Sequence, residues 1–132
     1  MARARFIPRR QSDLTFTLFI DSEEAWFWTV QCHRLKADGA RLSQGVGDVV
    51  RPCEPLDVLK AVEDLYRRRF LKSDHLKVLS DYGQQLLVPD YRREAEYRAA
   101  KLWRESHEKL GKVLLAKGIV ERISRYGGIS SN

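Results

Sequence analysis

The sequence predicts a mainly α-helical protein: a single compact multi-helix domain with one short extended segment near its start. Apolar residues recur at helical spacing in long stretches, and glycine or proline stands at the ends of these stretches. The chain has 132 residues, 43% of them hydrophobic, which suffices for one core. We therefore expect a flexible basic arm over residues 1–12 and one helical domain over residues 13–132.

The extended segment is predicted over residues 14–20, where side chains alternate in the manner of a strand. Leu14, Phe16, Leu18 and Ile20 fall on the face that we expect to be buried. The sequence offers no clear partner strand. We therefore expect an isolated extended segment that lies on a helical core.

Residues 22–38 are compatible with either a strand or a helix. Aromatic and β-branched side chains over residues 25–30 favour a strand. A helix is indicated by Asp21 and Glu24 at its start, by basic residues near its end and by Gly39 after it. Because capping, charge polarity and period agree, we expect a helix.

Three more helices are predicted, over residues 55–70, 74–82 and 90–117. The first begins at Pro55 and is expected to bury one apolar stripe, formed by Leu56, Val58, Leu59, Val62, Leu65, Tyr66 and Phe70. Ser73 is predicted to cap the second helix, while Gly83 and Gly118 are predicted to end the second and third. Their lengths match a trihelical, helix-turn-helix-like C-terminal part, in which the third helix would present its first residues to a nucleic-acid groove.

The positive charge of the chain is concentrated in its first ten residues. The whole chain carries 24 basic and 18 acidic residues, a formal net charge of +6. Four of these charges come from Arg3, Arg5, Arg9 and Arg10, in a stretch without acidic residues. Unstructured basic arms bind phosphate backbones or enter a minor groove, although such an arm can equally serve solubility alone.

Two further groups of arginines stand at predicted helix ends. Arg67, Arg68 and Arg69 close the helix that begins at Pro55, and cations there are fully explained by the helix dipole. Arg92 and Arg93 fall in the predicted first turn of the last helix, where they oppose the dipole. Contact with phosphate would explain this second group.

Trp26, Phe27 and Trp28 form the densest aromatic cluster. A helix cannot bury three consecutive bulky side chains on one face, so we expect at least one of them to point away from the core. An exposed aromatic side chain is a common anchor of protein interfaces. The cluster is therefore a candidate dimer or partner contact.

Catalytic and metal-binding patterns are not evident in the sequence. Cys32 and His33 are adjacent, and Cys53, His75 and His107 stand apart, so no metal-ligand spacing occurs. No nucleophile motif is present, and we expect neither enzymatic activity nor a cofactor. No apolar run approaches the roughly 18 residues that span a membrane. Two free cysteines and the lack of a secretory signal pattern favour a cytoplasmic protein.

The leading hypothesis is a small regulatory protein that binds nucleic acid, most plainly DNA, through arginine–phosphate contacts. The predicted contact residues are Arg3, Arg5, Arg9, Arg10, Arg67, Arg68, Arg69, Arg92 and Arg93. The alternative is a non-catalytic subunit that forms a dimer or larger assembly through the aromatic face of Trp26, Phe27 and Trp28.

Overall fold

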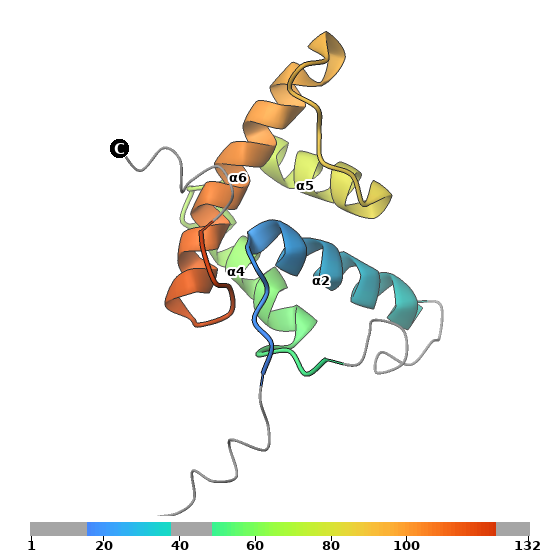
Figure 1. Cartoon of the computed structure of the whole chain (residues 1–132). Coiled ribbons are helices and arrows are strands. Elements are labelled where there is room, and N and C mark those ends of the chain that lie inside the picture. The colour runs from blue at the N-terminus through green and yellow to red at the C-terminus, as the bar shows by residue number, and fades with distance from the viewer. Residues whose placement is uncertain (1–15, 38–48, 124–132) are drawn as a thin grey trace, which may run out of the picture.

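A computed structural model describes residues 16–37 and 49–123, and this part of the chain is mainly helical (Figure 1). Its elements are α2 (Ser22–Ala37), α4 (Pro55–Arg67), α5 (Ser73–Gln85), the 3-10 turn η1 (Glu94–Glu96) and α6 (Tyr97–Ala116). The predicted basic arm, Leu14, Gly39 and the C-terminal tail lie outside the described residues.

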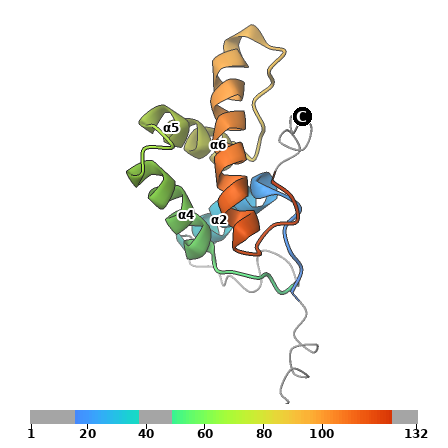
Figure 2. The ribbon, with the colours of Figure 1, turned by 90° about the vertical axis from the view of Figure 1, so that its left-hand side faces the viewer.

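Helix α6 is the longest element and organises the packing of the others. It packs against α2, α4 and α5, and α2 in turn packs against α4 and α5. The largest fully buried side chains between them are Phe19, Leu71, Leu79, Trp103, Leu110 and Leu114. The first half of α6 extends beyond α2 and α4, with the connection from α5 running beside it (Figures 1 and 2). This projecting end carries residues 86–100.

The choice of a helix over residues 22–38 is confirmed by α2. Asp21 caps the helix, because its Oδ1 atom accepts a hydrogen bond from the Glu24 backbone N–H at 3.2 Å. Thr29 has a β-branched side chain, which favours strands, yet it lies in the helix. Its hydroxyl donates to the Ala25 carbonyl one turn earlier at 2.8 Å. Capping and charge polarity therefore outweigh the β propensity of this stretch.

The buried stripe of α4 differs from the predicted one. Val58, Ala61, Val62 and Leu65 are buried, whereas three predicted members, Leu56, Tyr66 and Phe70, are exposed. The buried four already follow an i, i+3, i+4, i+7 pattern that fills one helical face. Helix geometry consequently directs Leu56 and Tyr66 outward. Phe70 lies beyond the end of α4 and is exposed as well.

The C-terminal ends of α4, α5 and α6 share one hydrogen-bond pattern. In α4, the Phe70 N–H bonds the Leu65 carbonyl and the Arg69 N–H bonds the Tyr66 carbonyl, which is the Schellman motif. The same two bonds recur at the ends of α5 and α6. The motif requires one residue in the left-handed region, a position that glycine fills most easily.

The residue in that left-handed position differs among the three helices. It is Arg69 after α4 (φ 69°), Leu86 after α5 (φ 56°) and Gly118 after α6 (φ 77°). The predicted end at Gly118 is therefore confirmed. The predicted end at Gly83 is wrong, because α5 continues to Gln85. Ser73 is the first residue of α5 rather than its cap, which is Lys72.

Within residues 16–20, the described part of the predicted extended segment, the buried side chain differs from the expected ones. Phe19 is fully buried, whereas Phe16 and Ile20 of the predicted inner face are exposed. The Phe19 N–H donates to the Ile119 carbonyl, and the Phe19 carbonyl accepts from the Glu121 N–H. These bonds form a parallel bridge between Phe19 and Val120. The register is thus set by the chain after α6, which no local alternation reveals.

Gly83 lies inside α5 and faces the indole of Trp26. A Cβ atom at residue 83 would lie 2.7 Å from Trp26 Nε1 and 3.2 Å from Val30 Cγ2. The indole cannot move aside freely, because it is buried and its Nε1–H donates to the Leu79 carbonyl at 2.9 Å. Close packing of α2 on α5 therefore requires glycine here.

Replacing Gly83 with alanine tests this contact, since two effects oppose one another. Helix propensity alone would stabilise Gly83→Ala by about 1 kcal/mol. We expect the overlap with Trp26 to prevail, with the free energy of unfolding lowered by about 1–2 kcal/mol in urea titrations. In a Trp26→Phe background, which removes Nε1, the same substitution should cost much less. A stabilised Gly83→Ala protein would contradict the contact.

Candidate functional site

Two groups of the sequence-predicted arginines lie in the described part of the chain, and the structure does not bring these two groups together. Arg3, Arg5, Arg9 and Arg10 lie outside the described residues. Residues 67–69 lie at the end of α4, whereas residues 92–93 lie in the connection between α5 and η1. The α4–α5 loop and this connection occupy separate edges of the molecule (Figure 2). The described arginines therefore do not form one surface.

Arg92 and Arg93 precede the last helix instead of opening it, which corrects the prediction of a helix from residue 90. Asp90 Oδ1 accepts bonds from the Arg92 backbone N–H and Nε at 3.0 and 3.2 Å, and these bonds hold the pKa of Asp90 below its ordinary value. Arg93 Nε lies 3.6 Å from Glu96 Oε2. Glu96 Oε1 also accepts the Asp90 N–H at 3.0 Å. Carboxylates thus order this connection and balance the charge of both arginines.

The α4–α5 loop presents a different arrangement, which we call the basic corner: Arg67, Arg69 and Lys72. All three are exposed, and their side chains line a surface hollow of about 490 Å³ together with Tyr66, Leu71 and Ser73. Among the described residues, no acidic side chain forms an ion pair with any of the three. Arg68, by contrast, pairs with Asp64 at 3.3 Å. The hollow is therefore a local concentration of uncompensated positive charge.

Two exposed aromatic side chains were missed by the sequence interpretation: Tyr66, which lines the hollow of the basic corner, and Phe70, which follows Arg69 in the chain. Tyr66 is 44% exposed and Phe70 is 52% exposed. Both were assigned to the buried stripe of α4. The spacing of Val58, Val62 and Leu65 was the available signal, because those residues already complete the inner face.

The aromatic cluster of α2 packs inside the molecule. Trp26 is buried, and Phe27 and Trp28 are half-buried against the core. The Trp28 ring lies 4.9 Å from that of Phe19, and the Phe27 ring lies 5.6 Å from that of Trp103. The expectation that one member points away from the core is therefore wrong. The exposed parts of Phe27 and Trp28 remain the sole basis of the predicted interface.

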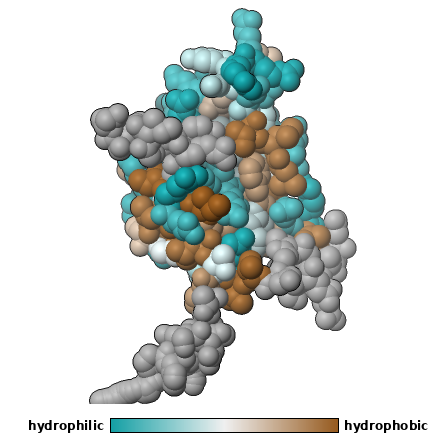
Figure 3. All heavy atoms as spheres, viewed as in Figure 1, coloured by the Kyte–Doolittle hydropathy of each residue, from teal (hydrophilic) through white to brown (hydrophobic). Residues whose placement is uncertain are grey.

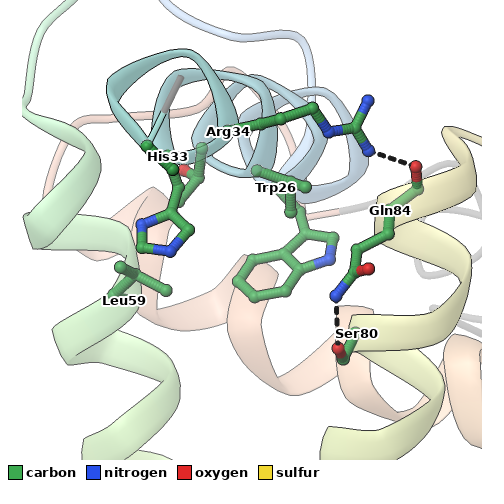
Figure 4. A pocket seen from close by; sticks show the side chains of 9 residues that line it. Trp26, His33, Arg34, Leu59, Ser80 and Gln84 are labelled. Carbon is green, nitrogen blue, oxygen red and sulfur yellow. Dashed lines mark hydrogen bonds between the residues drawn. The ribbon is translucent and has the colours of Figure 1, made fainter. Parts of the chain in front are cut away.

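A second hollow of about 500 Å³ lies between α2, α4 and α5 (Figure 4). The indole of Trp26 and the side chain of Leu59 line it, and His33 points into it from α2. Arg34 crosses to α5 and bonds the Gln84 carbonyl, which leaves its guanidinium directed along the rim (Figure 4). The lining of this second hollow is mostly apolar and carries no carboxylate.

A buried polar pair joins the start of α2 to the middle of α6. Ser22 Oγ lies 2.8 Å from His107 Nδ1 and donates to the His107 carbonyl at 3.2 Å. The single hydroxyl proton of Ser22 serves one of these two contacts, so the tautomer of His107 sets which atom donates between Ser22 Oγ and His107 Nδ1. The buried Nε2 atom has no partner among the described residues. Burial lowers the pKa of His107 to about 3, so the ring is neutral at physiological pH.

Neither cysteine has the environment of a nucleophile. Burial, with a smaller contribution from Asp57 and Glu54, raises the pKa of Cys53 to about 11. Burial also raises the pKa of Cys32. Both are free thiols that stay protonated at neutral pH. Within residues 16–37 and 49–123, no group of three or more metal-ligating side chains comes together.

Comparison with known proteins adds no assignment to these sites. No family model, curated protein or solved structure matches the chain. In the part of the chain that the structure describes, no helix has the length and apolar character needed to cross a bilayer.

His107 predicts a specific dependence of stability on pH. The unfolded chain binds the proton near the ordinary pKa of 6.5, whereas the folded chain does so only near 3. The stability is therefore complete above pH 6.5 and is lost as the pH falls toward 3, by about 2 kcal/mol at pH 5. Urea titrations at neutral pH and at pH 5 measure the loss.

His107→Gln should flatten this pH profile, while the exposed His33→Gln variant should retain it. If the wild-type protein and His107→Gln lose equal stability between neutral pH and pH 5, another group carries the dependence.

Proposed function

We propose that this protein binds nucleic acid, with the basic corner and the N-terminal arm as its phosphate-contacting surfaces. The observation that carries the proposal is the hollow at the start of α5, where Arg67, Arg69 and Lys72 converge without an acidic ion-pair partner among the described residues. Contacts between such cations and phosphates supply most of the non-specific affinity for nucleic acids. The positive end of the α5 dipole adds to the potential there.

The helix dipole explains only part of the arginine group. Arg67 lies in the last turn of α4 and Arg68 caps it, so both cations favour the helix end. Arg69 lies past the helix at φ 69°, where a side chain costs about 1 kcal/mol relative to glycine. A side chain retained at a strained position supports a role for that side chain outside the fold.

The exposed rings of Tyr66 and Phe70 favour single-stranded over double-stranded nucleic acid. Aromatic side chains beside a basic groove stack on unpaired bases and are tolerant of sequence. A duplex would leave both rings without a base to contact. We therefore assign phosphate contact to the basic corner and base stacking to Tyr66 and Phe70.

The other sequence-derived candidates have weaker support. Arg92 and Arg93 bond Asp90 and Glu96, which reduces the charge that they offer to a phosphate. The alternative of an assembly through the α2 aromatic cluster has only the exposed parts of Phe27 and Trp28 in its favour.

The salt dependence of binding tests the basic corner. We expect the wild-type chain to bind a fluorescein-labelled oligonucleotide of mixed sequence, measured by anisotropy at several salt concentrations. Arg67→Gln with Arg69→Gln should weaken binding and reduce the slope of log K against log salt by roughly 1.4 units for a single strand. Deleting residues 1–10 should reduce it by up to roughly three units.

The matched control is the double variant Arg92→Gln with Arg93→Gln. It also removes two positive charges, but from arginines that form ion pairs with Asp90 and Glu96. Its slope should stay close to that of the wild-type protein. Equal losses in the two double variants would show an effect of net charge alone, and absence of binding by the wild-type chain would reject the function.

Arg69→Gly separates binding from stability, because it should move them in opposite directions. Glycine suits the left-handed position, so the free energy of unfolding should rise by about 1 kcal/mol. Loss of one phosphate contact should nevertheless weaken oligonucleotide binding and lower the salt slope by roughly 0.7 units. Unchanged affinity in this more stable variant would remove Arg69 from the site.

A further inference from the structure

Two cations of the basic corner occupy positions where the fold disfavours a basic side chain. Lys72 is the N-cap of α5, at the positive end of the helix dipole, where serine, threonine or aspartate is usual. Its ammonium group has no lone pair with which to accept the first N–H groups of the helix. Arg69 stands at φ 69°, a conformation that favours glycine. An anion in the hollow that both side chains line would offset both costs.

The positive charge of the corner is bounded by carboxylates on both helices. On α4, Asp64 lies one turn before the corner and pairs with Arg68 at 3.3 Å. On α5, Asp74 follows Ser73 and pairs with Arg98 of α6 at 2.8 Å. A nucleic-acid strand that continued along either helix would therefore bring its next phosphates toward a carboxylate. The corner suits one phosphate group better than a run of them.

A hydrophilic surface alone does not provide such a site. Figure 3 shows a hydrophilic tip at the projecting end of α6. Arg92 and Arg93 lie in this projecting part, but they pair with Asp90 and Glu96. The basic corner differs because its three cations have no acidic ion-pair partner in the described part of the chain.

The backbone that carries these cations is held in place from two sides. Leu71 is 1% exposed and anchors the loop in the core. The Lys72 backbone N–H donates to His75 Nδ1 at 3.0 Å, and His75 Nε2 lies 2.9 Å from Glu105 Oε1 of α6. The loop therefore does not have to become ordered when an anion binds, which lowers the entropy cost of binding.

The phosphates of a nucleic acid are of two kinds, which differ in charge and in the number of free oxygens. A phosphodiester inside a strand carries one negative charge, with two free oxygens. A phosphate monoester at the end of a strand carries a charge of about −1.5 to −2 at neutral pH, with three free oxygens. Three oxygens can each meet one of the three cations, and a strand that ends in the hollow leaves it on one side only. The hollow therefore matches a monoester better than a diester.

From these observations we infer that the basic corner binds the terminal phosphate monoester of a nucleic-acid strand. The inference rests on the proposed function and adds which part of the strand this site recognises. Arg67 and Arg69 supply guanidinium groups, which bind phosphate oxygens in pairs, and Lys72 supplies a compact charge. Tyr66 lines the same hollow, and its exposed ring can stack on the terminal base.

Fluorescence anisotropy with internally labelled single-stranded oligonucleotides of one sequence tests the inference. The strands carry a phosphate at the 5′ end, a phosphate at the 3′ end, or hydroxyl groups at both ends. We expect one of the phosphorylated strands to bind the full chain about tenfold more tightly than the hydroxyl strand, because it adds charge-assisted hydrogen bonds. A methyl ester of that phosphate, which removes the second ionisation and keeps the phosphate in place, should lose most of this gain.

Lys72→Gln should remove most of the preference for the phosphorylated strand. Lys77→Gln is the matched control, since Lys77 is exposed on the same helix but pairs with Asp81 at 3.3 Å, and it should keep the preference. Lys72→Ser adds a second readout, because serine is a favourable N-cap. This variant should unfold at a higher urea concentration than the wild-type protein and still lose the preference, which a general loss of folding cannot imitate.

Equal affinity for the phosphorylated and hydroxyl strands overturns the inference and leaves the proposed function standing. An equal loss of preference in Lys77→Gln overturns it as well. A nucleoside monophosphate that binds as tightly as the phosphorylated strand would assign the hollow to a free nucleotide, which also overturns the inference. Absence of binding to every strand rejects the proposed function together with this inference.

Discussion

The burial of Trp103 at the junction of three helices is the constraint on which the rest of the structure depends. Its indole is 1% exposed, and Nε1 donates to Glu23 Oε2 at 2.7 Å. The ring also contacts Phe27, Tyr82 and His107. An indole N–H and a carboxylate are each costly to bury without a partner, and the hydrogen bond between them offsets both costs. α2 must therefore be a helix that begins beside α6, and α5 must close over the same ring.

Features that depend on the local chain could be predicted from the sequence. Asp21 and Glu24 placed the start of α2 against the β propensity of its aromatic residues, and Pro55 and Gly118 marked the first and last boundaries of the C-terminal helices. These signals act within one turn of helix, through capping and backbone conformation. The helical class follows from them, without any knowledge of which side chains meet across the fold.

Features that depend on distant partners could not be predicted. Phe19 is buried where the chain after α6 pairs with it. Gly83 lies within α5 at the point where the indole of Trp26 packs closely on that helix. The sequence also shows arginines without showing which carboxylates meet them. Arg68 and Arg92 form ion pairs, whereas Arg67 and Arg69 form none with residues 16–37 and 49–123, and only the folded chain distinguishes the two cases. A candidate site chosen from the positions of arginines in the sequence therefore includes arginines whose charge an ion pair already balances.

In the described part of the chain, two residues other than glycine adopt a left-handed backbone conformation, and they stand on either side of helix α5. Arg69 precedes it and Leu86 follows it, so the backbone at each end of α5 has a conformation that glycine adopts at lower cost. The basic corner lies at the first of these ends, and the exposed side chain of Leu86 lies at the second. Glycine at either position would relax the backbone at that end of α5 and leave both hydrogen bonds of the Schellman motif in place.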